Sequence, residues 1–451
     1  MKLLTRLGHG TLFHGLLSQF KCRRSTGIRF IHQIAASQHS RKAAATMDPS
    51  WVLLHSRDSR RNDSFAADAK TAAETRTSTG QRLRVAFDLA APPEASLLHY
   101  ECAEAARHDK YGSTFNIVAA HGDSVLLRLW RVRKPTPLVG PYDHFVYRFG
   151  GEGARPPSLS LLPALKVMKK YEEGIGDPNC RPLLNEDTGI LRRGDDGKFL
   201  LARIEVLLEH SEGRGMANLC MLRPGCSQWE EKRLVPIVYE EGYEVTGSSP
   251  YMAIPVGDRF LCWWVGSDTG FILCDMADDA NPKLRQVPLP EMPYDPDYYT
   301  DDLLPLTDSR SMGAAGASSL RFVAIEPRCC CGGFGRSSCL RSQYAFTVTT
   351  WTLTLTMDGP VTWVKEGVMD CEELWALPGY EGIPHVHLQC PVVSLDNPDI
   401  VCFWVVDSME ERKAWMIKVD TRRKVLLAAV QCTTDASKSY DSYDLRQAKL
   451  Q

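Results

Sequence analysis

The sequence predicts an all-β protein, built as a β-propeller of five to seven four-stranded sheets. Three observations predict it: short apolar runs recur along most of the chain, turn residues separate them, and helical periodicity is sparse. At 451 residues the chain is too long for one ordinary compact core, so its length suggests two or three domains or one large repetitive domain. Paired β-sandwiches are the alternative architecture, because the repeats are not recognisable by residue identity.

The strand candidates are rich in Val, Ile, Leu, Phe and Trp, and Gly, Asp and Pro bound them. The most apolar ones begin near residues 124, 199, 260, 321 and 400, and each interval holds further short strands. Intervals of about 60–80 residues match a four-stranded antiparallel sheet with its loops, the unit that propellers repeat around an axis. The clearest candidates are Leu83–Phe87, Ser124–Trp130, Phe199–Leu207, Arg259–Val265, Arg321–Ile325 and Ile400–Val406.

Helical segments are few. Pro93–Ala106 and Leu159–Tyr171 are short helix candidates, and Glu372–Leu377 suits a single turn. The sequence His121-Gly122-Asp123 is interpreted as a turn between two strands, although it also places an imidazole near a carboxylate.

Charge is distributed unevenly along the chain. Residues 1–46 carry eight of the 53 Lys and Arg residues and none of the 55 Asp and Glu residues, so the remainder is net acidic. An acidic body binds polyanions poorly, which disfavours a nucleic-acid partner. No apolar run approaches 18 residues, so we expect no transmembrane segment.

The first 46 residues have the composition of an organelle transit peptide, because they are basic, acid-free and rich in Arg, Ser and Ala. Leu and Phe recur there at roughly helical spacing. We expect import into the mitochondrion, or otherwise the plastid, if this leader is genuine. Met47 is an alternative start, which would leave the protein in the cytoplasm or nucleus. The predicted organisation is a leader over 1–46, a β-rich domain over 47–432 and a polar tail over 433–451.

The chain has 15 Cys residues, an odd number. Cys262, Cys274 and Cys402 lie inside apolar strand candidates, where a thiol packs as a small hydrophobe. No secretory signal precedes the body, so a reducing compartment is expected.

A Cys-rich segment over residues 329–339 is the least ordinary motif. Its four thiols, Cys329, Cys330, Cys331 and Cys339, are candidate zinc ligands if the chain folds back on itself. Three consecutive Cys side chains diverge, however, and no CxxC pair is present. A redox or disulfide role and a plain Gly-rich loop therefore remain as alternatives, and the cofactor is unassigned.

His385 and His387 form a second candidate metal pair. On a strand, residues two apart point to the same face, which suits two ligands. Cys390 would lie on the other face unless a bulge intervenes, and a partly exposed strand end is the alternative interpretation. No nucleophile elbow, zinc-protease pair or phosphate loop occurs, so no catalytic residue is assigned.

Several stretches resemble a known family. They include MDPSWVLL, RTSTGQRLRVAFDLAAPP, VAAHGDSVLLRL, LLRRGDDGKFLLA, IPVGDRFLCWWV and the long block from EPRCCCGGFGRSSC to WMIKVDTRRKVLL. Together they are similar to the plant domain of unknown function 1618 family, which is expanded in grasses, over residues 47–432. The resemblance implies a propeller-like fold, includes the Cys-rich segment in the family pattern, and supplies no reaction and no active site. Family members distantly resemble kelch-like domains found beside F-boxes, but no F-box pattern occurs here.

The leading functional hypothesis from the sequence is a non-catalytic protein-interaction scaffold with a protein partner. The rival is an enzyme, or a metal or redox protein, that uses the 329–339 thiols or a pocket at the channel mouth. Small-ligand binding in the channel is a third hypothesis. Propellers host all of these functions, so the fold alone does not choose among them.

Overall fold

The computed structural model describes residues 49–61, 70–102, 114–130, 142–151, 155–166, 181–194, 198–208, 215–239, 250–265, 270–292, 306–329, 344–406, 414–432 and 445–449. The chain divides into residues 1–46 and 47–451, and all described residues belong to the second part. The predicted leader therefore lies outside the described residues. No helix in the described ranges has the length and apolarity needed to cross a bilayer.

The described residues form six four- or five-stranded blades, numbered 1–6, in which neighbouring strands pair antiparallel apart from one parallel pair in blade 1. Blade 1 contains five strands, in the order β2-β3-β4-β1-β25, and blades 2–6 contain four each. Blade 1 comprises β1 (Trp51–Arg61), β2 (Ala73–Arg76), β3 (Arg82–Asp88), β4 (Ala95–Cys102) and β25 (Leu445–Lys449). Blade 2 comprises β5 (Thr114–His121), β6 (Ser124–Trp130), β7 (Tyr142–Arg148) and β8 (Ser158–Leu161). Blade 3 comprises β9 (Thr188–Arg193), β10 (Lys198–Leu208), β11 (Gly215–Leu222) and β12 (Glu230–Val238).

The last three blades follow the same pattern. Blade 4 comprises β13 (Pro250–Val256), β14 (Phe260–Val265), β15 (Phe271–Asp275) and β16 (Lys283–Val287). Blade 5 comprises β17 (Arg310–Ala314), β18 (Ser319–Pro327), β19 (Phe346–Thr354) and β20 (Trp363–Asp370). Blade 6 comprises β21 (Leu388–Val393), β22 (Ile400–Val406), β23 (Ala414–Asp420) and β24 (Val425–Cys432). Blades 3 and 4 join into one eight-stranded sheet, because β12 and β16 pair in parallel over two residues each.

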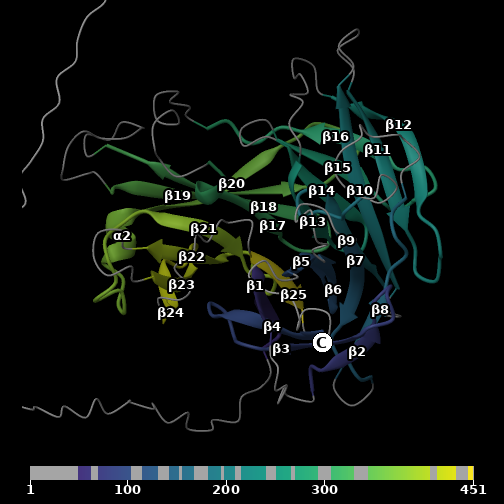
Figure 1. Cartoon of the computed structure of the whole chain (residues 1–451). Helices are drawn as coiled ribbons and strands as arrows, with labels where there is room; N and C mark the ends of the chain where they lie inside the picture. The colour runs from purple at the N-terminus through teal and green to yellow at the C-terminus, as the bar shows by residue number, and fades with distance from the viewer. Residues whose placement is uncertain are drawn as a thin grey trace, which may run out of the picture. The chain divides into compact units, whose positions relative to one another are not determined.

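The blades are arranged around an axis, with the first strand of blades 2–6 and β25 of blade 1 innermost. Strand β5 contacts β9, β9 contacts β13, β13 contacts β17 and β17 contacts β21, while β1 and β25 both contact β5. Figure 1 shows these strands gathered near the centre of the molecule and β24 at the outside of its sheet. The prediction of an all-β, propeller-like fold is confirmed, and the six blades lie within the expected range of five to seven.

Buried apolar side chains fill the interfaces between neighbouring blades. Six clusters of such residues occur among the described residues, one for each pair of adjacent blades. The cluster that closes the ring packs Trp51 and Leu53 of β1 against Val392 and Trp404 of blade 6. Burying one large apolar side chain contributes about 1.5–3 kcal/mol, so these interfaces supply most of the stabilisation.

The two ends of the domain meet in blade 1. Strand β25 pairs antiparallel with β1 over five residues, from Trp51 opposite Lys449 to His55 opposite Leu445. The segment expected to be a polar tail therefore contains the strand that completes the first sheet, while residues 433–444 lie outside the described residues. The chain thus continues from the last blade into the first, where pairing with β1 holds its end.

Two helix predictions were wrong and one is confirmed. The segment predicted as the helix Pro93–Ala106 contains strand β4, in which Ser96, Leu98, Tyr100 and Cys102 are buried and alternate with partly exposed residues. That period of two lets β4 pair with both β3 and β1, which overrides the helical composition of the segment. In place of the second helix, Ser158–Leu161 form β8 and an irregular segment follows to residue 166. The predicted single turn is helix α2 (Cys371–Trp375), and α1 (Leu306–Ser309) is a further short turn.

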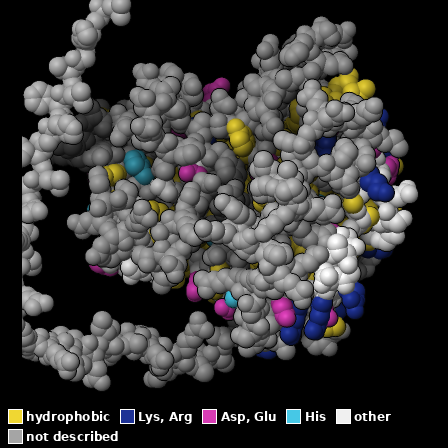
Figure 2. Space-filling view, in the orientation of Figure 1, with side chains coloured by type: hydrophobic (Ala, Val, Ile, Leu, Met, Phe, Trp, Pro, Cys, Tyr) yellow, Lys and Arg dark blue, Asp and Glu magenta, His cyan; other side chains and the backbone are white. Residues whose placement is uncertain are grey.

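Described charged side chains on the visible surface are mixed in sign. At the lower right of Figure 2, Lys and Arg side chains lie beside Asp and Glu side chains. One such ion pair joins Glu74 on β2 and Arg82 on β3 at 2.6 Å, and both side chains are exposed.

Candidate functional site

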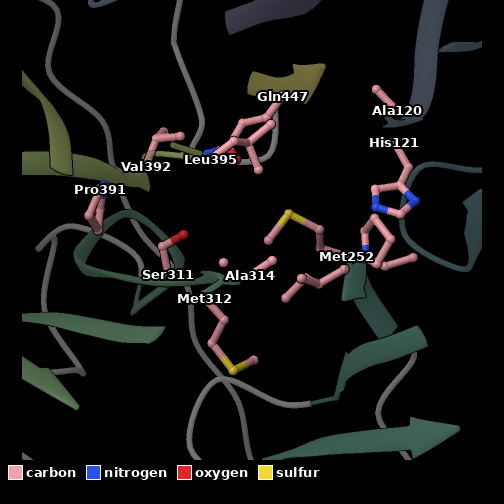
Figure 3. Close-up of a pocket in the computed structure, with 14 residues that line it drawn as sticks. Ala120, His121, Met252, Ser311, Met312, Ala314, Pro391, Val392, Leu395 and Gln447 are labelled. Atoms are coloured by element: carbon pink, nitrogen blue, oxygen red, sulfur yellow. The ribbon is translucent and has the colours of Figure 1, made fainter. Parts of the chain in front are cut away.

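The inner strands enclose a cavity of about 100 Å³ at the axis of the propeller. Strands β5, β13, β17, β21 and β25 contribute to its lining, as does Leu395 just beyond β21 (Figure 3). Most of the lining is apolar, with Met252, Ala314, Val392 and Leu395 among the contributing side chains. The polar groups in the lining come from His121, Ser311 and Gln447, described next.

His121 ends β5 and is held as a neutral imidazole. The backbone N–H of Arg192 donates a hydrogen bond of 2.9 Å to Nδ1, which leaves the ring proton on Nε2. Burial, followed by the charge of Arg192, lowers the pKa of His121 to about 4, against the opposing effect of Asp258 and Asp123. At neutral pH the ring therefore offers an N–H donor and no charge.

The turn after His121 is fixed by a carboxylate surrounded by arginines. Asp123, with a side chain only 3% exposed, lies 3.1 Å from Arg192, 3.3 Å from Arg148 and 2.5 Å from Arg155. Burial acts to raise the pKa of Asp123, but Arg148 and Arg192, together with hydrogen bonds from Ser124 and Arg155, hold it below its ordinary value. Because Arg192 belongs to blade 3, this cluster joins two blades directly behind the imidazole. The turn predicted from His121-Gly122-Asp123 is present between β5 and β6, with His121 lining the cavity and Asp123 buried among the arginines.

Ser311 and Gln447 reach the same cavity from the other blades. Ser311 lies on β17 and is 9% exposed. Gln447 lies on β25, where its amide N–H donates to the carbonyl oxygen of Val393 and so orients the amide oxygen. Gly313 of β17 also lines the cavity, and glycine is needed there because an added Cβ would lie 2.8 Å from the Cβ of Val393. Neither polar residue stands out in the sequence, because only closure of the ring brings β17 and β25 together.

The Cys-rich segment is only partly described. Cys329 follows β18 and is partly exposed, whereas Cys330, Cys331 and Cys339 lie outside the described residues. The neighbouring Arg328 forms an ion pair of 2.5 Å with Asp370, the residue that caps α2. Zinc binding by these four thiols stays a prediction, and elemental analysis of the reduced protein tests it.

His385 and His387 lie in the irregular segment before β21, because the strand begins only at Leu388. The strand placement that would point both rings to one face is therefore not present, and the two residues lie at the approach to the strand, with His385 exposed and His387 half-buried, close to the alternative of a partly exposed strand end. The ring of His385 stacks on Trp375 at 4.7 Å with an interplanar angle of 2°, while His387 lies 5.8 Å from the ring of Phe346. The two imidazoles thus have separate aromatic neighbours. Among the described residues, no three or more His, Cys, Asp or Glu side chains are grouped as metal ligands.

The buried thiols have the packing role that the sequence predicts. Cys262, Cys274 and Cys402 are fully buried in blades 4 and 6. Burial raises the pKa of each thiol, to about 12 for Cys402. Because the thiolate is the reactive form, these cysteines are inert components of the core.

The outer strand β24 has an unusual surface. It reads VLLAAVQC and contains no charged residue, and in the described part it pairs only with β23. Val425 is 44% exposed and Leu427 is 47% exposed. Exposed and half-buried residues alternate along its whole length. An exposed apolar edge with free main-chain groups is a site where another strand can add.

A comparison with known families supports the resemblance drawn from the sequence. Residues 264–402 match the family described as "Protein of unknown function (DUF1618)". The match begins near the end of β14 in blade 4, covers blade 5 and ends within β22 of blade 6, and it includes the Cys-rich segment. No curated protein matches the chain.

Several solved structures resemble the chain at low similarity. The periplasmic gluconolactonase PpgL of Pseudomonas aeruginosa is 12% identical, with 86% of this chain and 90% of that chain covered and a TM-score of 0.29. A catalytically inactive virginiamycin B lyase from Staphylococcus aureus, in complex with quinupristin, is 9% identical, with 88% and 98% covered and a TM-score of 0.29. At these values neither structure informs the activity of this chain.

Proposed function

We propose that the protein is a non-catalytic protein-interaction scaffold, and that its partner adds an extended segment to blade 6 along β24. The observation that carries the proposal is the charge-free, apolar and exposed outer edge of β24. A partner strand would receive main-chain hydrogen bonds from that edge, and its side chains would pack against Val425 and Leu427.

The other outer strands show how this chain shields an edge. Protein edges are usually protected by charge, by proline, by shortness or by a covering element. Strand β8 is only four residues long and β16 is covered by β12. The remaining outer strands carry protecting residues: Glu74 and Arg76 in β2, Glu230, Glu231, Lys232, Arg233 and Pro236 in β12, and Lys365 and Glu366 in β20. Among the described outer strands, β24 alone has none of these devices, which supports a role in binding.

The same features define the chemistry of the partner segment. A charged side chain opposite Val425 or Leu427 would lose water without gaining a counter-charge, so the paired stretch should be uncharged and apolar. At one end of β24, Arg422 and Arg423 are 70% and 81% exposed at the side chain and form only long ion pairs, at 3.6 Å with Asp399 and 3.9 Å with Asp420. An acidic residue flanking the partner strand would complement them.

A capture experiment with matched variants tests the proposal. Tagged wild-type protein, Leu427→Lys and Val364→Lys are used to recover binding proteins from extract of the cells that make the protein. Val364, on β20, is 54% exposed and serves as the control for adding a charge to an outer strand. We expect a protein that wild type and Val364→Lys recover equally and that Leu427→Lys loses, with equal thermal midpoints for all three. A partner that Leu427→Lys retains would contradict the proposal.

We also propose that residues 1–46 direct the protein to the mitochondrion, or otherwise to the plastid. The support is their basic, acid-free composition. Residues 1–50 fused to a fluorescent protein should accumulate in the organelle, whereas a fusion in which Arg23, Arg24 and Arg29 are replaced by Glu should not. Diffuse cytosolic fluorescence of the first fusion would contradict the proposal.

A further inference from the structure

We propose that the axial cavity is a binding site for a small, uncharged molecule that carries one hydrogen-bond acceptor and one donor on an otherwise apolar body. The site is independent of β24, since it lies at the opposite end of the blades, on the innermost strands.

Three neutral polar groups converge on the cavity from three different blades (Figure 3). The Nε2–H of His121 is a donor, because its Nδ1 already accepts from Arg192. The amide oxygen of Gln447 is an acceptor, because its amide nitrogen already donates to Val393. The hydroxyl of Ser311 can donate or accept. Within the described residues, none of these three atoms has a protein partner, so a ligand or water must satisfy them.

The charge of the cavity restricts the ligand. The lining contains no Asp, Glu, Lys or Arg side chain. Behind His121, Arg192 and Asp123 form an ion pair at 3.1 Å, and Asp258 also acts on the imidazole from outside the lining. An ion entering the apolar channel would lose its hydration without finding a counter-charge, which makes a neutral ligand the better match.

The size and lining of the cavity indicate the ligand's body. A protein cavity of roughly 150 Å³ lined by aliphatic groups holds a benzene molecule. The present cavity of about 100 Å³ is two-thirds of that size, so it holds about four non-hydrogen atoms of a ligand, namely its polar group and the carbons beside it. Met252 and Leu395 would contact the apolar part of that group, while His121, Ser311 and Gln447 would fix its orientation. The ligand class is thus a small neutral amide or hydroxy-carbonyl compound.

Three probes of matched ring size test the inference by NMR titration of the whole protein at pH 7. The probe 2-pyrrolidinone carries both a carbonyl and an N–H, cyclopentanone carries only the carbonyl, and pyrrolidinium carries a charge. We expect 2-pyrrolidinone to saturate at millimolar concentration, cyclopentanone to bind about tenfold more weakly because one polar partner is lost, and pyrrolidinium not to bind.

Two variants locate the binding. Ala314→Leu fills the cavity and should abolish saturation, and Ser311→Ala should weaken 2-pyrrolidinone several-fold, with both proteins keeping the wild-type circular dichroism spectrum. Val364→Lys, on the outer strand β20, should bind as wild type does. The inference is overturned if no probe saturates, if pyrrolidinium binds as tightly as 2-pyrrolidinone, or if folded Ala314→Leu binds unchanged. None of these outcomes depends on whether β24 binds a partner.

Discussion

Replacing Asp123 by Ala should destabilise the protein far more than removing an ordinary ion pair. The Asp123 side chain is 3% exposed. The two guanidinium groups whose charges act most strongly on its carboxylate belong to Arg192 and Arg148, which are 11% and 18% exposed at the side chain. Removing one partner of a buried ion pair costs about 3–5 kcal/mol, because the remaining charge stays buried without compensation. The Arg155 side chain is 40% exposed, so water screens its charge and its pairing with Asp123 should contribute little to the free energy of unfolding.

Denaturant unfolding at pH 7 measures this loss, with Glu74→Ala as the matched control. Glu74 pairs with Arg82 at 2.6 Å, but both side chains are largely exposed, so the control should unfold close to wild type. The Asp123→Ala variant should also lose part of the pH dependence of stability. Its depressed pKa means that the stabilisation is present above the pKa of an unfolded Asp and is lost as the pH falls. A Asp123→Ala variant that loses no more stability than Glu74→Ala would refute the assignment of this cluster as a structural link between blades.

Three further outcomes are expected. Gly257→Ala should lower the thermal unfolding midpoint clearly more than Gly80→Ala does. Both glycines have positive φ, +58° and +83° respectively. A Cβ at Gly257 would lie 2.1 Å from a carbonyl oxygen of blade 5, whereas a Cβ at Gly80 would meet open space. Burial, followed by the charge of Arg128, lowers the pKa of the native His144 imidazole to about 3. Below about pH 6.5 the unfolded chain therefore binds a proton that the folded protein does not, and acid favours unfolding. His144→Gln should reduce the loss of unfolding free energy between pH 7 and pH 5 by about 2 kcal/mol in denaturant unfolding. Ala448→Asp should destabilise by about 3 kcal/mol or more in denaturant unfolding, because it buries a carboxylate in the closing strand β25, whereas Ala429→Asp on the exposed face of β24 should be nearly neutral.

The architecture was predictable from the sequence because four-stranded sheets leave a local signature. The runs SVLLRLW and RFLCWWV become β6 and β14, whose side chains are covered on both faces by neighbouring blades. The helix predicted over 93–106 failed because composition was weighed above the alternation in ASLLHYEC. The role of Leu445–Lys449 was not predictable, because β25 has a weak pattern of its own and gains its place by pairing with β1, almost 400 residues earlier.

The candidate sites were only partly predictable. His121 and Asp123 were noticed as neighbours, but their environment comes from Arg192, Arg148 and Arg155 in other segments. Ser311 and Gln447 gave no signal, since an isolated polar residue in a short strand has many explanations. For β24, the apolar run Val425–Val430 indicates a strand, but the sequence does not show that the strand lies at an outer edge. That position follows from the order in which the blade is built.

Hydrogen exchange of the complex between the full chain and its captured partner tests the central claim most directly. In the free protein, the outward-facing amides of β24 should exchange quickly, because no described strand pairs with them. In the complex, we expect the backbone amides of residues 425–432 to gain protection from exchange, and those of the outer strands β12 and β20 to gain none. Protection that leaves 425–432 unchanged and falls elsewhere on the domain would contradict it.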